Sequence, residues 1–538
     1  MSGADKKTSG KSELRGAPLD VVRELLGEGR TDDVLAVVAA LVSRNRELEM
    51  LLAKIRESRN RGEHVSAEQL ALFTKLLREQ SGGDLSEADR KLAEAAEHNG
   101  GRPEPKAPPK QPPVRRKLPA NLRRVKNPIP VPEAERPCPT CGAERTCIAH
   151  ETTEVAELIP AEVIVRQDIR EILACRACDA EVVRAPMGDK VVAGGAYGSY
   201  LVSDLVVGKY WDSLPLNRQA QQLERLGLSI PSSSMADQIT WATDLLRPIY
   251  SRLQIAVLLA TVMHVDSTSI PVRDCDSPRG IHVGSLWGYV GDTTCAVYLY
   301  TSTGKKLGQR EGEMGPEQFL ALRKGPVVAD AANLFDASFE SGERTEIGCN
   351  MHGRRYFVKA LDAGDVRAAT PIAAFRALYD VEDAVRDASN EERCAERQRR
   401  SKPVYEELLR WVDAHRPLEP PNSLLGAALR YIDNHRVALT RFLDDGALPI
   451  DNGIVERLHR RPAVGRRNYL FAGSHAGAER AAIAYSVCAT CSLLGINPVE
   501  YLADVLPRLA RGVSEQDVAA LTPAAWKAAR APAKAAAA

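Results

Sequence analysis

The chain has 538 residues, too many for one ordinary hydrophobic core, so several domains are expected. Its composition is that of a soluble globular protein, with 44% hydrophobic and 27% charged residues, and the formal net charge of +1 favours no class of partner. No run of eighteen apolar residues is present and the polar N-terminus lacks a signal-peptide centre, which predicts an intracellular protein without membrane contact. In that reducing environment the eleven cysteines are expected to be metal ligands or buried thiols.

The N-terminal hundred residues are expected to form a flexible start, 1–30, and then a coiled-coil and helical region, 31–99. A heptad pattern has Val34, Leu41, Leu48 and Ile55 at d positions and Val38, Asn45 and Leu52 at a positions. An asparagine at an a position fixes the register of two-stranded coiled coils. The pattern therefore predicts a homodimer or larger assembly, with an amphipathic helix packed on its own chain as the alternative.

Residues 100–137 form a basic, proline-rich linker. Eleven prolines lie between Pro103 and Pro137, which forbids a regular helix and favours an extended chain. Nine Lys or Arg and a single acid lie between Arg102 and Lys126. A tract of this kind, including Arg115, Arg116 and Lys117, can follow a phosphate backbone. A solvated spacer is the alternative.

A zinc-binding module of zinc-ribbon type is predicted over residues 138–185. Two CxxC turns are separated by thirty-three residues, and each turn offers two thiolates to one tetrahedral Zn²⁺. The predicted ligands are Cys138, Cys141, Cys175 and Cys178, with Cys147 and His150 as second choices. The intervening Val- and Ile-rich segment alternates as a hairpin would.

Residues 186–254 are predicted to be helical. Within them a polar helix ends at Gly227, and Ser232 to Ser234 can cap the next helix. This outline is typical of a helix-turn-helix that binds DNA. The second helix lacks Lys and Arg until Arg247, so a plain helical hairpin is an equal alternative.

The chemistry is expected in residues 255–362, where strands replace helices. The apolar run AVLLATVMHVD ends at Asp266, two further strands follow, and a helix from Pro316 leads into GPVVAD, which ends at Asp330. Three strands, a helix and another strand predict the mixed α/β sheet of a ribonuclease H-like core. Its first and fourth strands are neighbours, so Asp266 and Asp330 would lie side by side. Two such carboxylates repel unless a cation lies between them, which indicates a Mg²⁺ site.

A helical insertion, 363–443, is expected to separate this sheet from the second part of the core, 444–512, and an Ala-rich tail, 513–538, to follow. The segment DNGIVERLHRRPAVGRR carries Glu456 on a helix that Pro462 should end. The helix can bury one side and direct Glu456 at the sheet. An exposed ion pair with Arg460 is the alternative.

Several of these motifs, in this order, resemble the insertion sequence 66 transposase family. They are HVDSTSIPV, GPVVAD, GCNMHGRRYF, DNGIVERLHRRPAVGRRNYLFAG and NPVEYL. The resemblance also covers the coiled coil, the basic linker, the double CxxC and the LPLNRQ segment, and so extends from about residue 30 to 510. It implies a multidomain α+β transposase of the DDE type in a bacterial cytoplasm, associated with the nucleoid when bound to DNA.

The resemblance assigns three catalytic acids, Asp266, Asp330 and Glu456, with Asp336 as the fallback for the second. They would hold two Mg²⁺ or Mn²⁺ ions for DNA cleavage and strand transfer at element ends and target DNA, with accessory proteins of the same element as further partners. Basic residues expected on DNA are His352, Arg354, Arg355, Arg460, Arg461, Arg466 and Arg467. The alternatives are a DNA-binding protein without catalysis and a metal-dependent nuclease that does not join strands.

Overall fold

The computed structural model describes residues 27, 31, 87–98, 162–173, 183–184, 191–192, 195–302, 313–330, 339, 342–420 and 422–530. Several predictions concern residues outside these ranges. They are the heptads of 34–55, the linker with Arg115, Arg116 and Lys117, the cysteines Cys138, Cys141, Cys175 and Cys178, and Asp336.

The described chain is mostly helical, with one mixed sheet, and it divides into two compact units. The smaller unit is Arg102–Gly188 with Asn217–Ser234, and the larger is Met1–Gly101, Asp189–Leu216 and Met235–Ala538. In the smaller unit β1 (Ile172–Leu173) pairs antiparallel with β2 (Val183–Arg184). This pair flanks the second CxxC in sequence, whereas the hairpin was expected between the two CxxC turns. Residues 162–171 are irregular and mostly exposed.

The helices before the sheet agree with the expected helical region. Gly227, with a φ of 88°, lies between two of them and makes the turn that the sequence predicts there. These helices are α5 (Ser199–Tyr210), α6 (Leu216–Arg225), α7 (Ser232–Leu245) and α8 (Arg247–Leu258).

The central sheet of the larger unit has five strands in the order β5-β4-β3-β6-β7. The first three are antiparallel neighbours, while β6 is parallel to both β3 and β7. The crossover from β5 to β6 contains α9 (Pro316–Ala321). The strands are β3 (Met263–Arg273), β4 (Ile281–Gly291), β5 (Cys295–Thr301), β6 (Gly325–Ala329) and β7 (Arg344–Gly348).

The first strand begins later than the apolar run that predicted it. The beginning of that run completes α8, in which Ile249, Leu253 and Val257 recur every four residues and are buried. A short apolar run cannot be assigned to helix or strand by hydrophobicity alone, and here the helical period extends to Leu258. The strand then passes through Asp266 and continues to Arg273.

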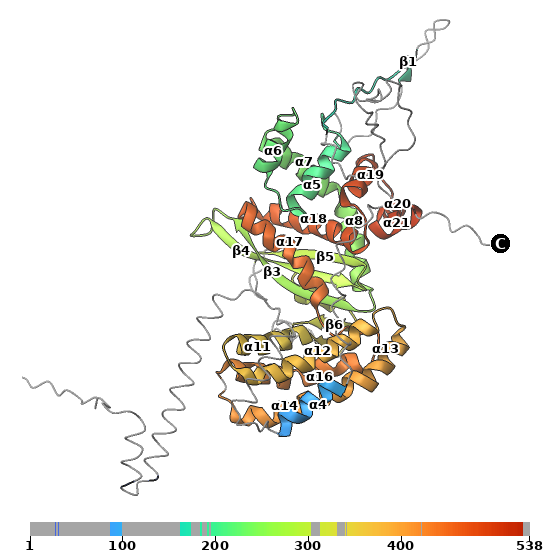
Figure 1. Ribbon diagram of the computed structural model, residues 1–538. Helices are drawn as coiled ribbons and strands as arrows, with labels where there is room; N and C mark the ends of the chain where they lie inside the picture. The colour runs from blue at the N-terminus through green and yellow to red at the C-terminus, as the bar shows by residue number, and fades with distance from the viewer. Residues whose placement is uncertain are drawn as a thin grey trace, which may run out of the picture. The chain divides into compact units, whose positions relative to one another are not determined.

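Two long helices from the end of the chain lie across the sheet. The helix α17 (Gly453–Tyr469) packs on β3 and β4, and α18 (His475–Leu493) packs on β5 (Figure 1). Pro462 does not end α17, contrary to the sequence prediction, because the helix continues past it to Tyr469. Arg466 fixes the second half of the helix by donating to Thr268 Oγ1 at 3.0 Å and to Ser269 O at 2.6 Å on β3.

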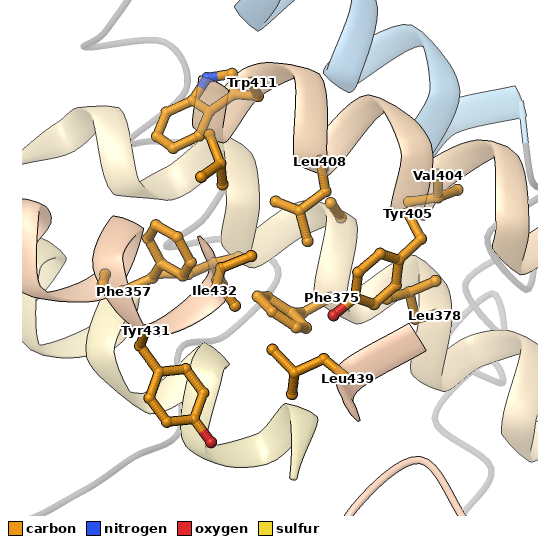
Figure 2. Packing of buried hydrophobic residues seen from close by; sticks show 14 of the residues in the cluster. Phe357, Phe375, Leu378, Val404, Tyr405, Leu408, Trp411, Tyr431, Ile432 and Leu439 are labelled. Carbon is orange, nitrogen blue, oxygen red and sulfur yellow. The ribbon is translucent and has the colours of Figure 1, made fainter. Parts of the chain in front are cut away.

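Residues 363–443 are helical and have their own core. Figure 2 shows Phe357 and Phe375 packed with Trp411 and Ile432, all with exposures of at most 2%. The N-terminal helix α4 (Glu87–His98) joins this core through Leu92, and Trp411 Nε1 donates to Asp89 Oδ1 at 2.6 Å. The helical region consists of these elements, the first of which precedes residue 363: α11 (Asn350–Asp362), η2 (Val366–Ala368), α12 (Ala369–Ala384), α13 (Asn390–Glu396), η3 (Arg397–Ser401), α14 (Lys402–His415), η4 (Arg416–Leu418), α15 (Leu424–Asn434), α16 (Arg436–Thr440) and η5 (Arg441–Leu443).

The expected Ala-rich tail is helical as far as Arg530. After α19 (Pro498–Ala510) come α20 (Glu515–Leu521) and α21 (Pro523–Arg530). Alanine favours helix, and Trp526 anchors the last helix by donating to Asp504 Oδ2 at 2.8 Å. Among the described residues, none of the helices has the length and apolarity that crossing a bilayer requires.

Candidate active site

Acidic residues lie on two neighbouring parallel strands, Asp266 within β3 and Asp330 just after β6. Met263 of β3 lies opposite Val327 of β6, and His264 lies opposite Val328. Continuing this register by two residues brings Asp266 opposite Asp330, the first residue after β6. The row continues across β7, where Gly348 lies opposite Ala329 and the next residue is Cys349. Residues opposite one another on neighbouring strands point to the same face, so this row presents its side chains together.

Asp266 lies in an environment that opposes its ionisation. Its side chain is 18% exposed, and its pKa is raised to about 7, first by burial and then by the neighbouring charge of Asp330. Glu456 raises the pKa further, while a hydrogen bond from the Ser267 amide, at 2.7 Å from Oδ1, opposes the shift. Three carboxyl groups that repel one another in a partly buried site fit a bound divalent cation, since carboxylate oxygens are the ligands that Mg²⁺ prefers.

Glu456 enters the site from the first turn of α17. Arg355 donates to its Oε2 at 3.1 Å, and His352 Nδ1 lies 3.4 Å from its Oε1. Both partners come from α11, so the glutamate faces inward against that helix, whereas Arg460 of its own helix is exposed. His352 and Arg355, which the sequence assigned to DNA, are therefore neighbours of the predicted catalytic glutamate.

The start of α17 is fixed by a fully buried asparagine. Asn452 donates from Nδ2 to Val265 O at 2.7 Å, and its Oδ1 lies 3.1 Å from Nδ1 of His264. Its backbone amide donates to Cys349 Sγ at 3.3 Å. One residue thus connects β3 just before Asp266, the end of β7 and the helix that carries Glu456. Burial lowers the pKa of His264 to about 4, so this histidine is neutral in the connection.

His459, one turn after Glu456, faces Asp266. Its Nε2 lies 3.6 Å from Asp266 Oδ2, and burial lowers its pKa to about 4. The ring occupies space left by Gly288, where a Cβ would come within 2.7 Å of His459 Cε1. No role for His459 was predicted from the sequence. Its i, i+3 spacing from Glu456 was the signal that could have found it.

The arginines predicted to bind DNA have different surroundings. Arg460 and Arg467 are exposed, and Arg354 is partly buried. Arg461 lies 4.9 Å above the Trp211 ring and donates to Trp211 O at 3.1 Å. Arg466 donates hydrogen bonds to β3, so its guanidinium is already engaged inside the protein. Of the five, Arg460 and Arg467 are the best placed to meet a ligand from solvent.

A second set of donors includes the same glutamate. Cys349, His352 and Glu456 offer ligand atoms that all lie within 4.8 Å of one another. Cys349 is fully buried, and burial raises the pKa of its thiol to about 12. No role for Cys349 was predicted from the sequence.

Comparison with known proteins decides the family. Residues 194–480, more than half of the chain, match the family model described as "Transposase IS66 family". The chain belongs to the IS66 family of transposases. Residues 135–179 match the zinc-finger binding domain of transposase IS66. This transposase therefore carries a zinc-finger domain, and its partner is DNA.

Relatives of similar length occur in Sinorhizobium fredii. The uncharacterised protein y4hP is 31% identical over 422 residues, which cover 74% of each chain. The uncharacterised protein y4jD is 30% identical over 421 residues, covering 76% of this chain and 82% of its own. The match to y4qI is 29% over 427 residues, with 77% and 78% covered. The similarity thus extends over about three quarters of the chain.

Proposed function

We propose that this transposase is a DDE enzyme in which Asp266, Asp330 and Glu456 hold Mg²⁺ or Mn²⁺ for DNA cleavage and strand transfer. The observation that carries the proposal is the parallel register of β3 and β6, which continues to Asp266 opposite Asp330. Burial first, and then the charges of Asp330 and Glu456, raise the pKa of Asp266, which also supports it. Like-charged carboxyls near a buried aspartate are unfavourable for stability, whereas a cation site requires them. The strand order β5-β4-β3-β6-β7 further supports a ribonuclease H-like core.

In this proposal each group of the chain has a distinct task. When bound by these three acids, two divalent ions would stabilise the attacking and leaving oxygens of an in-line displacement at phosphorus. The raised pKa means that Asp266 carries a proton for much of the time near pH 7 and gives it up when the site fills. Arg355 keeps Glu456 oriented, and His459 limits the rotation of the Asp266 carboxyl.

DNA would be held by groups outside this cluster. Arg460 and Arg467 project from the same helix as Glu456 and are exposed, which suits contacts to phosphates. Arg115, Arg116 and Lys117 of the linker would add non-specific affinity. The cysteines Cys138, Cys141, Cys175 and Cys178 would bind the structural zinc, and the heptads of 34–55 would join two chains so that two element ends are held together.

The test is an assay of cleavage and joining on DNA that carries the two ends of the element and a target plasmid. With Mg²⁺ the wild-type protein is expected to nick the ends and join them to the target. Asp266→Asn, Asp330→Asn and Glu456→Gln should each lower the rate by about 1,000-fold or more, because each removes several kcal/mol of transition-state stabilisation. All three should still bind the ends.

The exposed acid Glu343 provides the matched control, since Glu343→Gln removes a carboxylate from the same unit without touching the site. Asp336→Asn decides the second acid: full activity in this variant and none in Asp330→Asn supports the assignment. Cleavage without joined product would instead identify a nuclease. Binding without cleavage by the wild-type protein would identify a DNA-binding derivative.

A further inference from the structure

A thiol, an imidazole and a carboxylate meet beside the row of acids. Cys349 is the residue before α11, His352 lies three residues further on, and Glu456 approaches from α17. The distance of 3.4 Å from His352 Nδ1 to Glu456 Oε1 is that of two ligands on one tetrahedral ion. For Zn–N and Zn–O bonds of usual length this separation is about 3.3–3.5 Å. With Cys349 Sγ also within 4.8 Å of both atoms, a small side-chain adjustment would complete three ligands.

The types of donor determine which ion would bind. Thiolate and imidazole ligands favour zinc and related transition metals, whereas Mg²⁺ prefers oxygen. The sulfur is fully buried, while His352 and Glu456 are 18% and 17% exposed, so an ion can enter from their side. The site therefore differs in chemistry from the row of aspartates that it adjoins.

Arg355 would compete with an ion for His352 and Glu456, which it contacts in this structure. Its Nη1 lies 3.2 Å from His352 Nε2, and a guanidinium can only donate. The imidazole therefore accepts at Nε2 and carries its proton at Nδ1, toward Glu456. An ion at Nδ1 replaces that proton and needs the other tautomer, so Arg355 must withdraw from Nε2. Its side chain is 29% exposed and has room to do so.

We propose that Cys349, His352 and Glu456 form a binding site for zinc or a transition-metal ion of similar softness, with water as the fourth ligand. Because Glu456 cannot serve both sites at once, an ion held here withdraws it from Asp266 and Asp330. The site is then inhibitory: zinc-class ions suppress the Mg²⁺-dependent reaction. This second statement rests on the proposed function, whereas the binding itself does not.

Cobalt provides the direct test, because a thiolate bound to Co²⁺ gives a charge-transfer band in the near ultraviolet. The full chain is first loaded with zinc at its zinc finger, from which Co²⁺ does not displace the tighter-binding Zn²⁺. One further equivalent of Co²⁺ should produce the band in the wild-type protein. The band should be lost in Cys349→Ser and retained in Cys275→Ser, which alters an exposed cysteine.

Three further variants separate this site from the row of aspartates. His352→Gln should weaken Co²⁺ binding by more than about tenfold. Arg355→Gln should strengthen it, which a general loss of folding would not do. Asp266→Asn should leave the band unchanged, so that failure of the DDE assignment does not affect the result. Absence of the band in the wild-type protein, or an equal band in Cys349→Ser, would overturn the proposal.

The inhibition is tested in the cleavage assay with zinc added against constant Mg²⁺. Wild-type protein should lose activity at zinc concentrations that leave Cys349→Ser active. Equal inhibition of both proteins would show that zinc acts elsewhere and would refute the inhibitory role. If the wild-type protein has no Mg²⁺-dependent activity, the DDE proposal fails and the cobalt measurement still decides the binding.

Discussion

Two regions of the larger unit differ in whether their buried charges have partners of opposite charge. In the helical insertion, Arg397 is 1% exposed and makes a bidentate pair with Glu382, at 2.8 and 2.6 Å. It also donates to the carbonyls of Phe442, Asp445 and Leu448. In the sheet, burial first, and then the like charges of Asp330 and Glu456, raise the pKa of Asp266 to about 7.

The difference separates a structural network from a site. Around Arg397 the buried charge is neutralised and its hydrogen bonds are made, so the region is complete by itself. Around Asp266 the burial of like charges is unfavourable until a cation arrives. Like charges that the fold keeps together in a partly buried place indicate a functional site. A buried charge whose partners are all present, such as Arg397, is a weaker indication of function.

The largest effect on stability is expected in the completed network. Arg397→Met leaves the partly buried Glu382 without its partner and removes donors from three carbonyls. The free energy of unfolding should fall by about 3–5 kcal/mol, measured by denaturant titration. The double variant Arg397→Met/Glu382→Leu should recover part of the loss. A decrease in unfolding free energy of less than about 1 kcal/mol in the single variant would mean that the Arg397–Glu382 pair contributes little to the stability of the insertion.

Asp266→Asn is expected to raise the free energy of unfolding at pH 8, whereas Arg397→Met lowers it. The folded-state pKa of about 7 lies above the ordinary value of 3.8, so the native protein holds this proton more tightly than the unfolded chain. The wild-type protein therefore loses stability as the pH rises from about 4 to 7, and the variant does not. At 1.36 kcal/mol per pKa unit the ceiling is about 4 kcal/mol.

At pH 8 we expect a gain in unfolding free energy of about 1–3 kcal/mol for this variant, below that ceiling because the buried amide has unmet hydrogen bonds. Near pH 4 the wild-type carboxyl is protonated in the native state, so there the variant should be the less stable of the two by the cost of the unmet hydrogen bonds. Mg²⁺ should stabilise the wild-type protein at pH 8 and leave the variant nearly unchanged. Equal pH profiles of thermal unfolding for the two proteins would contradict the repulsion between the acids.

A smaller effect, on the affinity for a metal ion, is expected when the contact between α17 and the sheet is changed. In Gly288→Ala the new Cβ would lie 2.7 Å from His459 Cε1 and 3.1 Å from Val455 Cγ2, which pushes the helix from β4. Affinity for Mn²⁺, measured by calorimetry, should fall by about tenfold, as is usual when a residue behind a metal ligand is displaced. Gly473→Ala, where the Cβ meets open space, is the control. Unchanged affinity in Gly288→Ala would remove the positioning role of His459.

The smallest effect is expected for the exposed arginines. Arg460→Gln and Arg467→Gln should each reduce the slope of log affinity for duplex DNA against log salt by about 0.9, the contribution of one phosphate contact. Arg461→Gln should instead lower stability, because Arg461 stacks on Trp211 and bonds its carbonyl. If Arg461→Gln alone changed the salt slope, the surface used for DNA would differ from the one proposed.

The sequence predicted the elements whose signals are local. GPVVAD is apolar and begins after a helix, so its strand and the position of Asp330 followed directly. The segment DNGIVERLHRR likewise indicated a helix that carries Glu456, and α17 begins there at Gly453. Asp266 was found at the end of an apolar run, although the strand continues past it.

What the sequence did not predict depends on contacts between distant segments. The strand β7 was missed because its alternating charged residues look like a loop, yet Arg344 is buried and donates to Leu320 O at 3.1 Å. The inward turn of His352 and Arg355 depends on how α11 meets α17, which no local pattern records. Pro462 inside α17 is tolerated because side-chain bonds to β3 hold the helix beyond it.

The most direct test of the central claim is the anomalous scattering of Mn²⁺ in crystals of the full-length protein. The account predicts density among the carboxylates of Asp266, Asp330 and Glu456, with Arg355 displaced from or sharing the glutamate. Crystals of Asp266→Asn should show the density lost or reduced. Saturating Mn²⁺ that leaves this position empty, while Glu456 stays paired with Arg355 and His352, would contradict the assignment of the three acids as a metal site.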